Sequence, residues 1–563
     1  MHKMVQRTWC STLLTPILMP ISSFSQRHAF AALVLTCLSF SFGSRSISLA
    51  VDGAEYKLPV LSKPGTYEPE LGVVDVELSE YIGYAGLILE NNGLAPNVEF
   101  EKKYGFKLRL TLSENEDWSR LNRGELAASA TTADVLALYG DQMKVTVPVA
   151  FDYSFGADGI LVTKDIQNIG QLAGKIVVSA RFNESDFFLR YWADQQGLKI
   201  NVLASDSETP KADMINVLFT EGVDEAMAVF KADLPPANST NAKKSLFAGC
   251  VGWEPLTSDL LDEHKNELRF LVTNKNLLNI ADVLIVNQGF AEAQPKIVQA
   301  LVTAVLRGNM RARQLQKKPN KAEFDLIAKA LTTDPSSPGT AEDIERSIRN
   351  IYFMNTAENE AFFTDQLPRG DSFEGVWQSA NRLYGSALVS ANSHNSKVTL
   401  LPKIFRSSEI RSLSDGKISI PLLASNDKGT YSAIASANHD LVFQRNSAAL
   451  ETEAGAAGNA EILTALARKL KREVGCRILL RGHVDGSKLG NVPAEDRPEL
   501  EAQALQLSAE RAASVKTVLV DKFLIPEQQI KTEGVGASEP IPGAPGARNR
   551  RVEVRTMSLE LEP

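Results

Sequence analysis

Two charged residues in the C-terminal quarter of the chain could together bind a zwitterion. Asp485 ends the motif RGHVD, and Arg511 lies within LSAERAASV. A carboxylate binds an ammonium group, whereas a guanidinium can hold a carboxylate through two parallel hydrogen bonds. We expect Asp485 at the C-terminal end of a strand and Arg511 in the first turn of the helix that follows. If the strand and the helix pack side by side, the two charges flank one small zwitterion; without such a ligand they form an ordinary salt bridge.

The residues around this pair predict a small α/β unit. Strands are expected at DLVF, CRILLRG, IKTEGVG and RVEVRT, with amphipathic helices between them. Four motifs follow in order: LVFQRNSAAL (441–450), RGHVD (481–485), LSAERAASV (507–515) and RNRRVEV (548–554). Together they resemble the OmpA-like peptidoglycan-binding domain over residues 430–557. The resemblance implies peptidoglycan as ligand, with Asp485 on the ammonium and Arg511 on the carboxylate of the diamino acid in its stem peptide.

Other parts of this motif set leave alternatives open. Asn549, Arg550 and Arg551 match the family's NRR run, which implies either a contact with the glycopeptide or a framework role. The Asn that precedes the LS pair in the family is replaced by Ala504. An acidic insertion that includes NVPAEDRPELEAQ also lengthens the segment between the two charged motifs. Both differences fall on the rim of the expected pocket.

The larger, N-terminal part of the chain alternates strands and helices. Strands are predicted at VVDVELS, FKLRLTL, DGILV, KIVVSA, KINVLA, SLFAGCVGW and ADVLIVN. Such alternation favours parallel α/β sheets. From Ala291 to about Ser390 the pattern is mostly helical.

Residues 70–390 resemble periplasmic solute-binding proteins of the nitrate/sulfonate/taurine ABC-transporter type. The resemblance rests on SEYIGYAGLILENNGL, ATTADVLAL, DGILVTKDIQNIGQLAGK, CVGWEPL and FFTDQLPRGDSFEGVWQSANRLY. It implies two lobes. The predicted fold class is therefore α/β: a bilobal periplasmic-binding-protein fold (type II), followed by a smaller OmpA-like α/β sandwich domain.

In that bilobal fold, ligands lie between the lobes, at the C-terminal ends of the strands. The loops expected there carry the solute-binding candidates Glu80, Tyr81, Thr131, Thr132, Ser179, Trp253 and Glu254. Hydroxyl groups at helix starts suit an oxyanion or a carboxylate, whereas the acidic and aromatic residues suit an amine or an amino acid. The Thr pair also reads as a helix N-cap and Trp253 as a core residue. Arg181 is the one basic residue in these loops, which disfavours nitrate and sulfonate.

The first 50 residues predict a secretory signal. Four basic residues and no acid precede Val51, residues 29–42 form an apolar run, and Ser48-Leu49-Ala50 supplies small residues for cleavage after Ala50. An uncleaved membrane anchor is the alternative. Removing this segment changes the formal net charge from -8 to -12. An acidic chain lacks the basic footprint of a nucleic-acid-binding protein.

The cysteines and the missing catalytic motifs argue against an enzyme. Cys10 and Cys37 belong to the leader, while Cys250 and Cys476 are far apart and are expected to be small buried residues. A thiamine-pyrimidine synthase family shares the bilobal fold but carries a cysteine-rich motif and a cofactor lysine, and this part of the chain has only Cys250. We expect no enzymatic activity, no cofactor and no metal.

These features predict residues 1–50 as a signal peptide, 70–390 as a solute-binding domain, 391–429 as a linker and 430–557 as a peptidoglycan-binding domain. The first hypothesis is a wall-tethered solute-binding protein of the periplasm, near the outer membrane. Its expected partners are peptidoglycan, a small-molecule solute and, by resemblance, an ABC-type permease. The second hypothesis is an envelope structural or sensing protein whose bilobal domain binds a protein partner.

Overall fold

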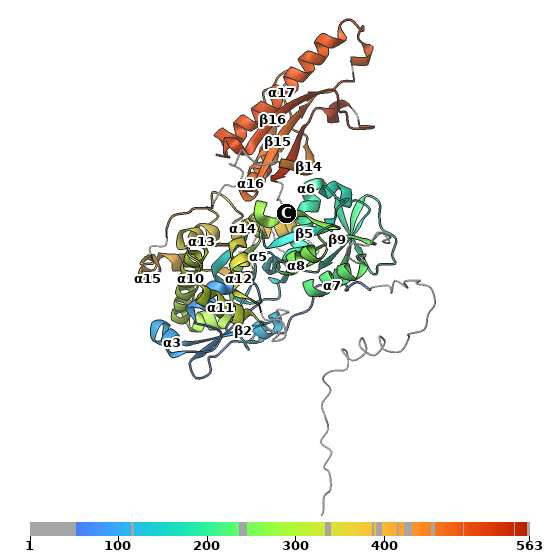
Figure 1. Cartoon of the computed structure of the whole chain (residues 1–563). Helices are drawn as coiled ribbons and strands as arrows, with labels where there is room; N and C mark the ends of the chain where they lie inside the picture. The colour runs from blue at the N-terminus through green and yellow to red at the C-terminus, as the bar shows by residue number, and fades with distance from the viewer. Residues whose placement is uncertain are drawn as a thin grey trace, which may run out of the picture. The chain divides into compact units, whose positions relative to one another are not determined.

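A computed structural model gives the fold of residues 52–559 (Figure 1). The description leaves out short stretches at 114–116, 236–244, 333–338, 386–387, 390–393, 395–396, 414–415, 421–430, 452–455, 488 and 545. The predicted signal peptide and its cleavage site lie outside the described residues, as do Cys10 and Cys37. The predicted linker falls partly within the omitted stretches.

The first lobe is built on a seven-stranded mixed sheet. Its order is β12-β4-β11-β3-β1-β2, with β13 beside β4. The strands are β1 (Val73–Leu78), β2 (Lys107–Leu112), β3 (Ala128–Thr132), β4 (Val145–Ser154), β11 (Ala281–Asn287), β12 (Ile351–Phe353) and β13 (Thr399–Leu400). β1 runs parallel to β2 and β3, but β11 is antiparallel to both β3 and β4. The parallel pairing expected from the alternation is present, but the sheet is mixed, because the chain leaves this lobe after β4 and returns in the opposite direction as β11.

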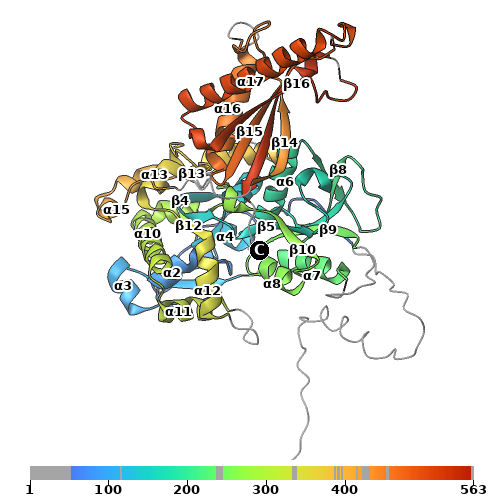
Figure 2. The ribbon, with the colours of Figure 1, turned by 45° about the horizontal axis from the view of Figure 1, so that its top comes forward.

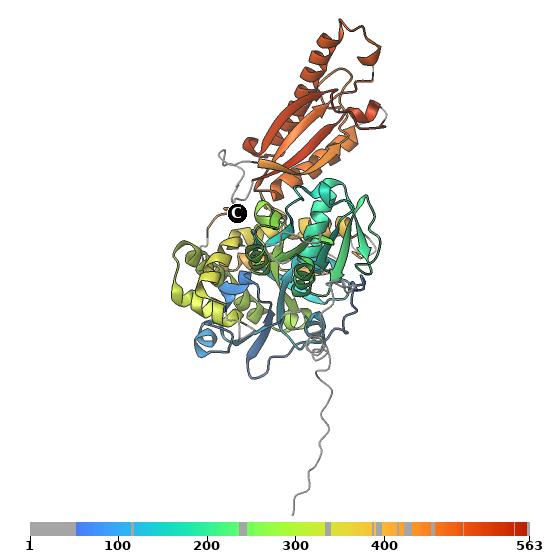
Figure 3. The same ribbon diagram turned by 45° about the vertical axis from the view of Figure 1, so that its right-hand side comes forward.

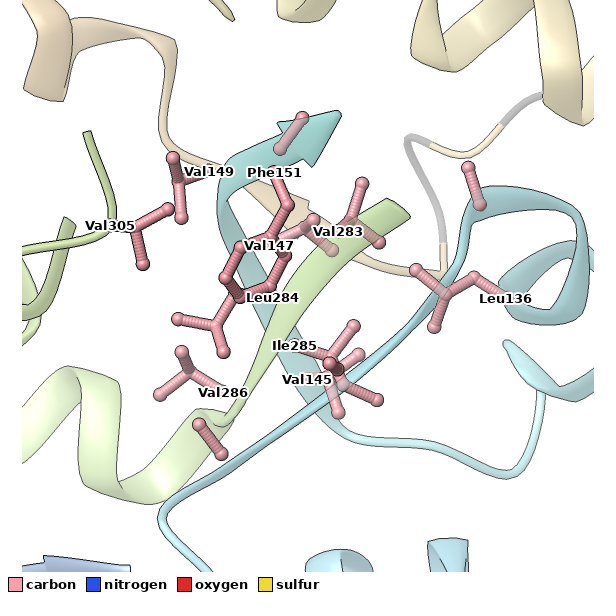
Figure 4. Packing of buried hydrophobic residues seen from close by; sticks show 14 of the residues in the cluster. Leu136, Val145, Val147, Val149, Phe151, Val283, Leu284, Ile285, Val286 and Val305 are labelled. Atoms are coloured by element: carbon pink, nitrogen blue, oxygen red, sulfur yellow. The ribbon is translucent and has the colours of Figure 1, made fainter. Parts of the chain in front are cut away.

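The core of this lobe covers both faces of its sheet. Figure 4 shows alternate side chains of β11 on opposite sides, Val283 toward Leu136 of α5 (Ala133–Tyr139) and Leu284 toward Val305 of α10 (Pro295–Lys317). A strand buried on both faces reads as a continuous apolar run rather than as an alternation. β4 is buried along its whole length for the same reason.

The second lobe lies entirely between β4 and β11 in the chain. Its six-stranded sheet has the order β10-β5-β9-β6-β8-β7. The strands are β5 (Asp158–Thr163), β6 (Ile176–Ala180), β7 (Lys199–Leu203), β8 (Met214–Thr220), β9 (Phe247–Trp253) and β10 (Leu268–Thr273). The chain thus crosses between the lobes twice, at 154–158 and at 273–281, which is the bilobal arrangement predicted.

Helices surround these two sheets (Figure 2). The longer ones are α6 (Glu184–Gln196), α7 (Val223–Asp233), α10, α11 (Lys321–Leu331) and α14 (Phe373–Tyr384), and the shorter ones are α2 (Ala85–Glu90), α3 (Val98–Tyr104), α4 (Trp118–Arg123), α5, α8 (Leu256–Glu263), α9 (Gln288–Ala293), α12 (Ala341–Ser347), α13 (Thr356–Phe363) and α15 (Ser408–Arg411). None of the helices in the described part of the chain has the length and apolar character that a membrane span needs.

The C-terminal domain is a four-stranded sheet covered by helices (Figure 3). Its order is β14-β17-β15-β16. The elements are β14 (Tyr431–His439), α16 (Ala456–Arg472), β15 (Cys476–His483), α17 (Arg497–Asp521), β16 (Ile530–Gly536) and β17 (Val552–Leu559). Buried aliphatic residues of both helices pack against the sheet, among them Leu466, Leu470, Ala512, Val515 and Leu519.

The start of this domain differs from the expectation. DLVF forms no strand; Phe443 makes only an isolated bridge with Leu450. The edge strand is β14, within a segment whose composition is typical of a linker. Its strand conformation comes from pairing with β17 along its length, a tertiary contact that local composition does not reveal.

Candidate functional site

Asp485 lies in the loop just after β15, as the sequence predicts. Its carboxylate accepts a hydrogen bond of 3.0 Å from the backbone N–H of Ser487. Arg550 Nη1 lies 3.6 Å from its Oδ2. Gly546 is packed against the same carboxylate, and a Cβ added there would lie 2.5 Å from both carboxylate oxygens. A side chain at position 546 would therefore push the carboxylate of Asp485 out of its present position.

Arg511 lies in the middle of α17, and its expected position in the first turn is wrong. The helix begins at Arg497, with Pro498 in its first turn. Proline is well suited to that position because it has no N–H to leave unsatisfied there. The second half of the acidic insertion, from Arg497 onward, thus adds turns to the start of α17.

Arg550 connects the two predicted residues, because it lies beside Asp485 and its charge also acts on Arg511. Arg511 is only 6% exposed. Its Nε donates a hydrogen bond of 3.1 Å to the carbonyl oxygen of Ser447, and its guanidinium lies 4.9 Å from the ring centroid of Phe443. Burial lowers its pKa, and the charge of Arg550 lowers it further. We call Asp485, Arg511 and Arg550 the wall site. Its carboxylate can bind an ammonium group, and its guanidinium groups can bind a carboxylate.

The two other residues predicted for this site make internal contacts. Asn549 accepts a 2.7 Å hydrogen bond from the N–H of Ile541. Arg551 donates from Nε to Asn438 Oδ1 at 2.8 Å. These contacts fit the framework alternative for Asn549 and Arg551. The middle residue of the NRR run, Arg550, is the one beside Asp485, and only its place in that motif pointed to it.

A second cluster of charges lies at one end of three central strands of the first lobe's sheet, where the chain crosses between the lobes. The strand register places Thr132, Asp282 and Asp152 opposite one another on β3, β11 and β4. Tyr84 donates a hydrogen bond of 2.7 Å to Asp282 Oδ1, and Tyr81 donates one of 3.2 Å to Asp152 Oδ1. Two carboxylates thus lie side by side on adjacent strands.

Asp158 and Asp134 complete this cluster. Asp158 begins β5 in the second lobe and accepts hydrogen bonds from Ser154 and from Asn274 Nδ2, the latter at 2.8 Å. Asp134 is in the first turn of α5 and is fully buried. Neither of its carboxylate oxygens has a hydrogen-bond partner in the described structure, and the same holds for Thr132 Oγ1. We call Asp134, Asp152, Asp158 and Asp282 the carboxylate cluster.

Burial raises the pKa of every member of the carboxylate cluster. The pKa values of Asp134 and Asp158 rise to about 7. The nearby charge of Asp158 adds to the rise at Asp134, although the Thr132 hydroxyl lies close enough to oppose it. The pKa values of Asp152 and Asp282 lie well above their ordinary range, first because of burial and then because of neighbouring carboxylates. Each acid therefore makes it harder for the next one to ionise.

The residues predicted to bind solute are only partly gathered here. Tyr81 and Thr132 lie at the carboxylate cluster, and Trp253 pairs with Asp158 in the strand register. Glu254 is close enough to Asp158 to raise its pKa, and it accepts a 2.7 Å hydrogen bond from Ser258.

The remaining candidates lie apart from the cluster. Thr131 pairs with Val283, which places it on the opposite face of the sheet from Thr132. Glu80 is exposed, and the hydroxyl of Ser179 is buried against the carbonyl of Ala180. Arg181 is occupied by an ion pair with Glu221 at 2.6 Å.

None of the four acids of the carboxylate cluster was predicted from the sequence. Its signal was a single Asp within an otherwise apolar run, as in VAFDYS, ADGILV and ADVLIV. The described residues contain no group of three or more His, Cys, Asp or Glu side chains placed to hold a metal ion. Cys250 and Cys476 are buried free thiols, as expected.

Comparisons with known proteins agree with the two-part organisation. Residues 442–553 match the OmpA family, so an OmpA domain forms the C-terminal part of the chain. No curated protein matches the chain.

Solved structures similar to the N-terminal part are periplasmic binding proteins. The aliphatic sulphonate binding protein of Escherichia coli is 15% identical, with a TM-score of 0.43, over 60% of this chain and 100% of that one. The alkanesulfonate-binding protein of Xanthomonas axonopodis pv. citri, bound to MOPS, is 13% identical, with a TM-score of 0.42, over 59% of this chain and 100% of that one. The nitrate-binding protein of Synechocystis PCC 6803 is 12% identical, with a TM-score of 0.43, over 61% of this chain and 90% of that one. Similarity at this level says nothing about which ligand this chain binds.

Proposed function

We propose that this protein is exported, attaches to peptidoglycan through its C-terminal domain and binds a small solute between its two lobes. The observation that carries the proposal is the wall site, where Arg550 lies beside Asp485 and its charge acts on Arg511, within the stretch that matches the OmpA family. Asp485 would bind the ammonium group of the stem-peptide diamino acid, and Arg511, with Arg550 beside it, would bind the carboxylate.

The low exposure of Arg511 makes its contact with the wall strong. A charge-assisted hydrogen bond shielded from water contributes about 1.5–3 kcal/mol. Since 1.4 kcal/mol is about tenfold in affinity, removing one such contact should weaken binding by roughly ten- to a hundredfold.

The test is co-sedimentation of the mature chain, residues 51–563, with purified peptidoglycan sacculi. Asp485→Asn removes the charge at constant size, and Arg511→Lys keeps the charge but loses the planar fork. Both variants should stay folded and sediment less than the parent. Asp521→Asn, an exposed acid at the end of α17, is the matched control and should sediment like the parent. Folded Asp485→Asn and Arg511→Lys proteins that sediment normally would disprove the wall site.

The solute-binding half of the proposal is supported by the carboxylate cluster. Its members come from both lobes, so a molecule bound to them would be enclosed by closure of the lobes around the two crossovers. Binding would be noncovalent and without a cofactor, with an ABC-type permease receiving the solute. Native mass spectrometry of the purified mature chain should find a co-purified small molecule. N-terminal sequencing of the periplasmic fraction should find a chain that starts near Val51.

A further inference from the structure

The carboxylate cluster differs from two other buried acids of the same lobes in having no cation. Asp186 is fully buried and pairs with Arg190 at 2.7 Å, and Glu77, which is 1% exposed, pairs with Arg120 at 2.9 Å. None of the four carboxylate-cluster acids takes part in an ion pair with a described residue. Glu358, which is 1% exposed, has no cation either, but two backbone N–H groups and the Tyr352 hydroxyl donate to it, whereas both oxygens of Asp134 lack a described partner.

Leaving these acids without a cation opposes folding. A buried carboxylate must either stay ionised without compensation or take up a proton that it would not hold in water. The strand register increases this cost because it places Asp152 directly opposite Asp282 on neighbouring strands. Carboxylates so close cannot both ionise without a large repulsion. A surface that only docked another protein would gain nothing from such a buried group.

The buried oxygens without a hydrogen-bond donor indicate which kind of ligand would suit the cluster. Tyr81, Tyr84, Ser154 and Asn274 each donate to one carboxylate oxygen of the cluster. Both oxygens of Asp134, the Oδ2 of Asp152 and the hydroxyl oxygen of Thr132 are buried without a partner. What remains is a set of separate acceptors on different elements, among acids that are costly to ionise without a positive charge beside them. A positively charged group that carries several N–H donors would satisfy it.

We infer that the solute is a cation with N–H donors, of the alkylammonium or guanidinium class. This inference rests on the proposed solute-binding function and names its ligand class. The ammonium or guanidinium group lies beside Asp158, whose charge acts on Asp134, Asp152 and Asp282, and its N–H groups take the place of the protons that these acids would otherwise hold. Tyr81 and Tyr84, whose ring centroids lie 5.4 Å apart, lie next to the same carboxylates. Such aromatic faces also attract cations.

An anionic solute does not fit this environment. The charged groups that most affect the pKa values of the four cluster acids are other carboxylates. Glu184 and Glu254 add two more acids, each close enough to raise the pKa of a cluster member. An anion placed among these acids would meet electrostatic repulsion.

The test is the thermal unfolding midpoint of the solute-free mature chain in the presence of chosen ions. Methylammonium, putrescine and agmatine are the N–H cations, and tetramethylammonium is the cation without N–H. Calcium and magnesium chloride test metal ions, and sodium nitrate and sodium ethanesulfonate test anions. At about 10 mM, at least one N–H cation should raise the midpoint by about 3 °C or more, because a ligand that binds only the folded state stabilises it. The other ions should not.

Two variants locate the effect. Asp134→Asn should lose most of the cation-induced shift, measured against its own midpoint without ligand. Asp224→Asn, an exposed acid on α7 in the second lobe, should keep the full shift. An N–H cation that stabilises Asp134→Asn as well as the parent would overturn the assignment to this cluster.

The possible outcomes distinguish the cationic class of the solute from solute binding itself. Stabilisation by nitrate, ethanesulfonate or a metal ion would overturn the cationic class and leave solute binding standing. A midpoint that no ion of any kind changes, together with no co-purified molecule in native mass spectrometry, would overturn both.

Discussion

Replacing Asp134 by Asn should stabilise the solute-free protein at neutral pH but not in acid. Asp134 is fully buried, and both of its carboxylate oxygens lack a hydrogen-bond partner in the described structure. Burial raises its pKa from an ordinary 3.8 to about 7. Asn has nearly the same shape and never ionises. The variant therefore removes the cost of a buried acid while keeping the packing.

The sign and size of the effect follow from the protons that each state binds. Between pH 4 and pH 7 the folded state holds a proton on Asp134 that the unfolded state has lost, so stability falls as the pH rises. A difference of about three pKa units, at 1.36 kcal/mol each, costs the parent on the order of 4 kcal/mol above pH 7. The Asn amide has its own buried N–H groups, which cost about 1–3 kcal/mol if they find no acceptor. This second cost is the same at every pH and cancels when two pH values are compared.

The assay is thermal unfolding of the parent and of Asp134→Asn at about pH 4 and about pH 7.5, after the solute has been removed. The difference between the two midpoints should grow in favour of the variant by several degrees from the lower to the higher pH. Asp224→Asn, whose carboxylate is exposed, should follow the parent at both pH values. A difference between Asp134→Asn and the parent that is the same at both pH values would show that Asp134 ionises normally, and the reasoning would fail.

Two further predictions concern the two sites. Gly546→Ala should weaken the affinity for sacculi by roughly tenfold or more while leaving the fold intact. Its methyl group would displace the carboxylate of Asp485, and one charge-assisted contact would be lost. Normal sedimentation would show that this carboxylate does not contact the peptidoglycan. The N–H cation identified by thermal shift should bind more tightly as the pH rises through about 7, the pKa of Asp134 and Asp158, because protons and the cation compete for the same oxygens. Isothermal titration calorimetry in buffers of different ionisation enthalpy should detect the released protons, and a pH-independent affinity would contradict this mechanism.

The C-terminal site was largely predictable because its motifs combine short-range pattern and chemistry. The position of Asp485 after a strand follows from a run of apolar residues that ends in a polar loop. The position of Arg511 within its helix did not follow, because the insertion carries Pro498 and good helix formers that add turns before the LS pair. Arg550 lies beside Asp485 through the fold of the loop before β17, which no local pattern describes.

The carboxylate cluster could not be predicted for a different reason. Asp152 and Asp282 are far apart in sequence, and each stands alone in an apolar run that is typical of a buried strand. Only the pairing of β4 with β11 brings them opposite each other. The strand β4 itself was absent from the predicted elements, so no register could be drawn for it. A charged residue within a fully buried strand is the sequence signal to follow in such cases, because folding tolerates it only with a partner.

The C-terminal domain shows how this chain stabilises a buried charge, the guanidinium of Arg481, without a ligand. Arg481 is 5% exposed and contacts Glu533, Glu539 and Glu553 at 2.8–2.9 Å. Although burial opposes it, hydrogen bonds from His483, Arg555 and Ser436 hold the pKa of Glu553 well below its ordinary value. There the acids surround a cation that the chain itself supplies, and the pKa of Glu553 falls.

In the carboxylate cluster the acids surround no cation, and their pKa values rise. Where acids accept hydrogen bonds from cationic side chains of the chain, as Glu539 and Glu553 do, their pKa values fall; where no such donor is described, the values rise. Asp134, Asp152, Asp158 and Asp282 have no cationic donor among the described residues, and a solute with a positive charge and several N–H donors would supply one.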